Sequence, residues 1–174
     1  MKNNRLKDLT FIAIFCALLS LSAMIYIPAQ VPITLQTLVL FLAMFILGGK
    51  RTIVLTLLYI ALGAVGAPVF SGFTGGIFRL FDASGGFIFG FAVASLVYWL
   101  STALGGNRTV VRIMGAFFAL LSIYATGTLW YAFVYLDGLP SFTAALAVTV
   151  LPFVIPDIVK LYIAYLIAKR IPRP

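Results

Sequence analysis

The chain has 174 residues, of which 63% are hydrophobic and only 9% are charged, and its mean hydropathy is +1.16. A soluble protein of this size could not bury so much apolar surface, so the composition predicts an integral membrane protein. The formal charge of +8 does not indicate nucleic-acid binding, because the basic residues stand singly or in pairs between apolar runs. With no histidine and a single cysteine, the chain excludes an internal disulfide and argues against a metal centre.

Six apolar runs are predicted to form membrane-spanning helices, since about 20 apolar residues cross a bilayer as a helix. They cover residues 9–28, 33–49, 52–67, 85–104, 113–135 and 155–168. Residues 141–153 are predicted to form a short outer helix or a lid-like segment. We expect the sixth span to begin near Pro156, because proline suits a first helical turn. The predicted fold is an all-α integral membrane protein with one six-helix domain over residues 1–174.

The distribution of charge predicts the orientation of these helices. With the N-terminus in the cytoplasm, ten of the twelve basic residues fall on the cytoplasmic side, as the positive-inside rule expects. The exceptions are Arg79 and Lys160, and three of the four acids, Asp82, Asp137 and Asp157, fall toward the outside. We therefore predict a multi-pass cell-membrane protein with both termini cytoplasmic and a ligand pocket near the extracellular side.

Asp157 and Lys160 are the strongest candidates for a binding site. They stand three residues apart in an apolar run, so a helix would place both on one face, with the acid in the first turn of the sixth helix. Charged residues inside a membrane are rare and often mark a substrate site. The alternative is an ion pair that holds two helices together or neutralises itself.

The connection over residues 68–86 carries further candidates. It is rich in glycine and aromatic residues, whereas a mere connector would be shorter and more polar. Arg79 could hold a ligand carboxylate or, alternatively, a lipid phosphate. Asp82 could contact the ligand or cap the fourth helix. Gly85 and Gly86 could let the backbone approach a ligand, or could serve only close helix packing.

Weaker candidates lie elsewhere in the chain. Five aromatic residues could wall the pocket, although most aromatic residues in such a chain face lipid or the core: Phe70, Phe73, Phe78, Trp130 and Tyr131. Thr34, Gln36 and Thr37 stand at the outer end of the second span. The Gln36 amide can donate and accept, and an interhelical hydrogen bond is the alternative to a ligand contact.

The chain resembles the biotin-specific substrate-binding subunit (S component, BioY) of energy-coupling-factor vitamin transporters. The resemblance is carried, in order, by Val31-Pro-Ile-Thr-Leu-Gln-Thr37, Leu58-Tyr59, Gly66-Ala-Pro-Val-Phe70, Gly75-Gly76, Ser84-Gly85-Gly86-Phe87, Gly90-Phe91 and Ile155-Pro-Asp-Ile-Val-Lys160. These motifs span most of the chain. The family typically reads Gly-Pro-Thr-Gly-Gly before its fourth helix, where this chain has Asp82-Ala-Ser-Gly-Gly86.

This resemblance implies high-affinity capture of biotin outside the cell, with outer loops forming a lid and no cofactor. Release inward would follow association with a membrane coupling subunit (T component) and a pair of ABC ATPases. Ala13 and Ala17, a small-xxx-small pattern on the first span, would form the surface that docks the coupling subunit. The chain has no phosphate-binding loop of the G-x-x-x-x-G-K-[ST] type, so energy would come from these partners.

The proposed ligand fits the candidate residues. Biotin's ureido ring offers two N–H donors and one carbonyl acceptor, which match Asp157 and Lys160, while its carboxylate would point outward toward Arg79. Three alternatives remain: an S component for a different vitamin, a membrane assembly subunit without a ligand, and a membrane enzyme. The enzyme would need a nucleophile–base pair or metal ligands, and without histidine the chain offers little for one.

Overall fold

The computed structural model describes residues 2–135 and 142–171, with side chains for residues 5–135 and 143–171. Asp137 and Arg173, which entered the charge pattern, lie outside these ranges. All six predicted spans contain a helix: α1 (Lys2–Ser22), α2 (Gln36–Leu47), α3 (Gly49–Val65), α4 (Gly85–Gly105), α5 (Thr109–Trp130) and α7 (Leu151–Arg170). Within the described residues, three stretches are long and apolar enough to cross a membrane, Gly85–Gly105, Thr109–Tyr135 and Thr143–Arg170.

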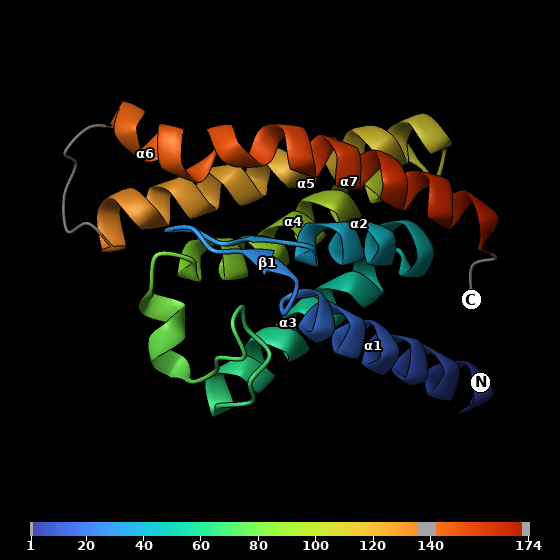
Figure 1. The fold of residues 1–174 in the computed structure, drawn as a ribbon. Helices are drawn as coiled ribbons and strands as arrows, with labels where there is room; N and C mark the ends of the chain where they lie inside the picture. The colour runs from blue at the N-terminus through green and yellow to red at the C-terminus, as the bar shows by residue number, and fades with distance from the viewer. Residues whose placement is uncertain (1, 136–141, 172–174) are drawn as a thin grey trace.

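Helix α2 is the centre of the helix packing. Leu40, Phe41, Ala43 and Met44 are completely buried, as expected for a short helix that is hydrophobic on all sides. It packs against α7 and α1, and α4 packs along α5 (Figure 1). Both termini lie at one end of the molecule, together with the α2–α3 and α4–α5 connections (Figure 1).

The first span ends earlier than predicted. Helix α1 stops at Ser22, and residues 23–35 hold a two-stranded antiparallel hairpin of β1 (Tyr26–Ile27) and β2 (Ile33–Thr34). Pro28 and Pro32 lie in the connection between the strands, where a missing N–H interrupts no helix. This hairpin sets Thr34 directly before the start of α2.

The predicted start of the sixth helix near Pro156 is wrong. A short helix, α6 (Phe142–Thr149), ends at Thr149, and α7 begins at Leu151 after Val150, so that Pro152 occupies the first turn of α7 and Pro156 lies inside it. Either proline is suited to a first helical turn, and the prediction placed the start of the helix at the later one. Asp157 is therefore the seventh residue of α7 and does not lie in the first turn. The helix dipole favours a carboxylate mainly within that first turn, so it does not hold Asp157 as the sequence suggested.

The long connection between α3 and α4 is ordered by local structure. Phe70 and Thr74 pair across a tight turn, and a 3-10 helix, η1 (Ile77–Phe81), follows before α4 begins. This connection and the β1–β2 hairpin lie at the end of the molecule opposite the two termini (Figure 1). Helix α5 continues into a π-helical turn, η2 (Tyr131–Tyr135).

Candidate functional site

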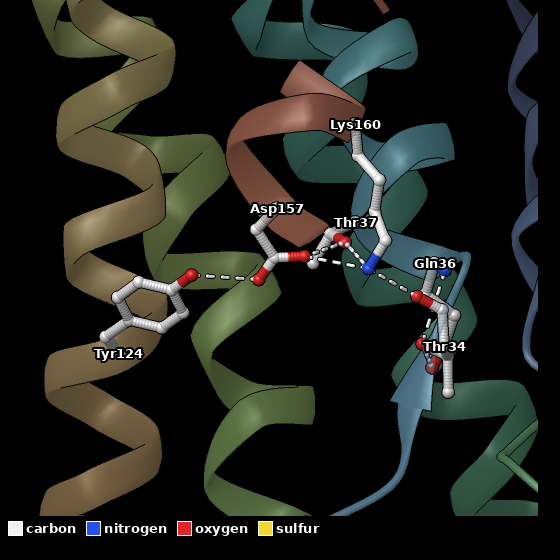
Figure 2. A network of polar contacts seen from close by, with 6 residues as sticks. All are labelled: Thr34, Gln36, Thr37, Tyr124, Asp157 and Lys160. Atoms are coloured by element: carbon white, nitrogen blue, oxygen red, sulfur yellow. Dashed lines mark hydrogen bonds and ion pairs between the residues drawn. The ribbon is translucent and has the colours of Figure 1, made fainter. Parts of the chain in front are cut away.

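An ion pair between Asp157 and Lys160 lies at the centre of the molecule. The Asp157 Oδ1 and Lys160 Nζ atoms are 2.8 Å apart, and the two side chains are only 2% and 10% exposed. Both residues come from one face of α7, as their spacing predicts, and point toward α2 (Figure 2). The pairing that the sequence left open is thus present in the structure.

Each charge of the pair is surrounded by hydrogen-bond partners. The Thr37 hydroxyl donates to Asp157 Oδ1 at 2.7 Å, and the Tyr124 hydroxyl of α5 donates to Oδ2 at 3.0 Å. The Lys160 ammonium donates to the Thr34 carbonyl at 2.8 Å and to the Thr37 hydroxyl at 3.1 Å (Figure 2). With Asp157 as the third acceptor, the ammonium uses all three of its donors.

A second chain of hydrogen bonds extends this network toward α3. The Thr34 hydroxyl donates to Gln36 Oε1 at 3.1 Å, and Gln36 Nε2 donates to the Tyr59 hydroxyl at 2.6 Å. Tyr59 in turn donates to the Val69 carbonyl at 3.0 Å. The interhelical hydrogen bond that was the alternative for Gln36 is therefore formed. Across the described part of the chain, no buried side-chain nitrogen or oxygen lacks a hydrogen-bond partner.

These polar groups form one wall of an inner cavity of about 40 Å³. Apolar side chains from α4, α5 and α7 and from the connection that follows α3 form the other walls: Phe70, Phe87, Ile88, Phe91, Ile123 and Phe153. The rings of Phe87 and Phe153 stack with centroids 5.8 Å apart. The site therefore combines a charged, donor- and acceptor-rich wall with flat aromatic surfaces, which suits a small ring that carries both N–H and carbonyl groups.

An outer cavity of about 380 Å³ adjoins the inner one and shares Pro32, Ser71 and Ser84 with it. It contains Arg79 and Asp82, whose Nη1 and Oδ2 atoms form an ion pair. Their side chains are 42% and 40% exposed. Asp82 does not cap the fourth helix as suggested, since the N-cap residue of α4 is Ser84 and no side-chain capping bond is formed.

The two candidate glycines serve helix packing. A Cβ atom on Gly85 would lie 1.9 Å from the Leu80 carbonyl oxygen, and one on Gly86 would lie 2.2 Å from the Trp130 Cβ. Neither glycine is among the described residues that line the inner or the outer cavity. The close contacts explain why no side chain fits here, and they favour the packing alternative over ligand approach.

Two of the aromatic candidates also lie away from the cavity walls. Phe73 is 71% exposed at the tip of a turn, with a positive φ of 58°. Tyr131 is 3% exposed and stacks on Tyr135 with ring centroids 5.4 Å apart. Neither belongs to the described linings of the two cavities. Of the predicted wall residues, Phe70 lines the inner cavity, and Phe87 and Phe153, which were not among the candidates, line it as well.

Sequence reasoning missed two polar members of the site, Tyr59 and Tyr124, whereas Thr37 was expected beside Thr34 and Gln36 at the outer end of the second span. Tyr59 belongs to a quoted motif, so it carried a local signal. Tyr124 stands alone in an apolar helix, and nothing in its neighbourhood indicated that its hydroxyl meets Asp157.

The remaining predicted residues and groups lie apart from the cavities. Ala13 and Ala17 are exposed on α1, one helical turn apart. At the end that carries the termini, Arg51 pairs with Asp8 at 2.8 Å, and Arg112 donates to the Phe45 carbonyl at the end of α2. Within the described residues, His, Cys, Asp and Glu side chains form no group of three that could hold a metal ion.

Comparison with known proteins agrees with this architecture. The model of the BioY family matches residues 1–174. A probable biotin transporter BioY of Pyrococcus horikoshii is 38% identical over 166 residues, which cover 95% of this chain and 96% of that protein. A biotin transporter BioY of Thermotoga maritima is 35% identical over 167 residues, with coverage of 95% and 96%. A biotin transporter BioY2 of Lactococcus lactis is 35% identical over 166 residues, with coverage of 92% and 87%.

The fold is also found in a crystal structure, that of the S-component for biotin from an ECF-type ABC transporter. The two structures agree with a TM-score of 0.86 over 98% of this chain and 93% of the other, at 22% sequence identity. At that identity the likeness concerns the fold, while the family match extends over the whole sequence. The chain therefore belongs to the BioY family.

Proposed function

We propose that this chain binds biotin with high affinity and acts as the substrate-capture subunit, or S component, of an ECF-type ABC transporter. The observation that carries the proposal is the buried Asp157–Lys160 pair on the wall of a cavity with aromatic sides. Support comes from the family match over the whole chain and from relatives named as biotin transporters.

The polar wall offers the groups that a ureido ring requires. The Asp157 carboxylate can accept from ring N–H groups, and the Lys160 ammonium can donate to the ring carbonyl. In the structure these groups are occupied by one another and by Thr37 and Tyr124. Binding therefore exchanges hydrogen bonds, so affinity depends on how well the ligand replaces the contacts that it displaces.

A bicyclic ring needs more room than the inner cavity of about 40 Å³ provides. Its entry requires side chains to move apart, and the stacked rings of Phe87 and Phe153 are placed to flank a flat ligand once separated. The carboxylate tail would then extend past Ser71 and Ser84 into the outer cavity, toward Arg79.

The orientation in the membrane follows from the charges. The basic residues near the termini and at the α2–α3 and α4–α5 connections define a cytoplasmic end, by the positive-inside rule. The hairpin and the η1 connection, at the opposite end, would then face the outside and admit the ligand. Arg79 and Lys160, the two basic residues that do not follow this rule, both line cavities.

Partners complete the proposed transport cycle. A coupling subunit and an ABC ATPase pair would supply energy, and the exposed Ala13 and Ala17 on α1 provide a surface on which another helix can approach closely. The alternative is an S component for another vitamin or an assembly subunit. A thermal-shift panel of vitamins separates these alternatives, because only the cognate ligand stabilises the folded protein.

The direct test is equilibrium binding of biotin to the purified chain and to two variants, Asp157→Asn and Lys160→Ala. Each removes one charge from the wall, and we expect each to weaken binding by at least about tenfold, since a charged hydrogen bond contributes about 1.5–3 kcal/mol. Tyr162→Phe, at a 62% exposed position of the same helix, is the control. Unchanged affinity in both charge variants would refute the assignment.

A further inference from the structure

The outer cavity contains a negatively charged side chain of the protein, the carboxylate of Asp82. The Asp82 backbone is held in place by two hydrogen bonds to its carbonyl oxygen, from Trp130 Nε1 at 3.2 Å and from the Gly85 N–H at 2.9 Å. Its carboxylate is directed at the Arg79 guanidinium and forms the ion pair. Arg79, the one arginine among the described residues that line this cavity, is thus already bound to a carboxylate.

This pair stands where the tail of a ligand from the inner cavity would emerge. Pro32, Ser71 and Ser84 line both cavities, so the inner cavity adjoins the outer one, which Arg79 also lines. A ligand carboxylate that reaches Arg79 must share or displace Asp82. If the two carboxylates share Arg79, two negative groups lie beside one cation, and like charges at short range repel. If Asp82 is displaced, its ion pair with Arg79 is lost.

We propose that Asp82 is a built-in competitor for Arg79, so that this chain binds ureido ligands with a neutral amide tail nearly as well as the free acid. The inference rests on the proposed function and adds a ligand class to it. A neutral tail leaves the Arg79–Asp82 pair intact, whereas an anionic tail gains Arg79 only at the expense of that pair. Asp82 therefore reduces the advantage that a free carboxylate would otherwise have.

The test measures equilibrium binding of biotin and of biotin amide to the unchanged full chain and to Asp82→Asn. Asparagine keeps the side-chain shape and the backbone carbonyl that Trp130 and Gly85 contact, and it removes the charge. Asp8→Asn is the matched control, because Asp8 also pairs with an arginine, is 37% exposed and lies on α1, outside the described linings of both cavities.

We expect Asp82→Asn to tighten biotin binding by about two- to fivefold, which is the range that a partly exposed ion pair supports. Biotin amide should gain less than about twofold, and Asp8→Asn should change neither ligand. In the unchanged protein the two ligands should differ by no more than about fivefold. This last measurement needs no variant and stands if Asp82→Asn fails to fold.

Several outcomes would overturn the inference. One is unchanged biotin binding in Asp82→Asn, a second is an equal gain for both ligands, and a third is the same gain in Asp8→Asn. Free biotin bound far more tightly than the amide by the unchanged protein would also contradict it. None of these touches the proposed function, which fails only if the unchanged chain binds neither ligand or if the Asp157 and Lys160 variants bind normally.

Discussion

Two ion pairs of the same spacing, Asp157–Lys160 and Arg79–Asp82, lie in very different surroundings. The first pair is 2% and 10% exposed and is enclosed by hydroxyl and carbonyl partners from three other elements. The second is 42% and 40% exposed beside an outer cavity. The spacing along the chain therefore predicts that an ion pair forms, whereas burial and the surrounding hydrogen-bond partners determine how much the pair contributes to the stability of the fold.

The largest difference should appear when one member of the buried pair is removed. Lys160→Met leaves the Asp157 carboxylate buried without its cation, which should lower the free energy of unfolding by about 3–5 kcal/mol. The double variant Asp157→Asn/Lys160→Met removes both charges and should recover most of that loss without restoring biotin binding. Thermal unfolding in detergent checks both. A double variant as unstable as the single one would contradict the charge explanation.

A smaller effect is expected from a single partner of the buried pair. Tyr124→Phe removes the hydroxyl that donates to Asp157 Oδ2, and a hydrogen bond to a charged group contributes about 1.5–3 kcal/mol. We expect the midpoint of thermal unfolding to fall, with Tyr162→Phe as an exposed control on α7 that leaves it unchanged. Equal shifts in the two variants would show that the hydroxyl bond to Asp157 contributes nothing specific.

The smallest effect on stability should come from the exposed pair. Arg79→Gln should change the free energy of unfolding by no more than about 1 kcal/mol, because water and salt screen half-exposed charges. The same thermal measurement, repeated at low and high salt, checks this. If Arg79→Gln destabilises the chain as much as Lys160→Met does, burial does not determine how much each ion pair contributes to stability.

Much of the architecture could be read from the amino-acid sequence. The six apolar runs predicted the helices, since the length of an apolar run and its flanking residues are local properties. The spacing of Asp157 and Lys160 predicted a shared face of one helix, and the structure places both on the same polar wall. Boundaries were less accurate, because Pro152 and Pro156 are equally suited to a first helical turn, and α7 has Pro152 in that turn.

The partners of the buried charges could not be read in the same way. Lys160 meets the Thr34 carbonyl across 126 positions of the chain, and Tyr124 reaches Asp157 across 33. Such contacts depend on the relative rotation and height of packed helices, which no local pattern encodes. The same holds for Gly85 and Gly86, whose role became clear from the atoms that a Cβ would meet.

The sequence alone thus predicted six helices in a strongly apolar chain, with one costly acid–base pair in the last of them, because composition and charge placement are visible residue by residue. The three-dimensional packing was needed to show that this pair is saturated by Thr34, Thr37 and Tyr124, and that a second pair lies in the adjoining outer cavity. The reason is physical: a hydrogen bond acts only within about 3 Å, and that proximity is created by folding.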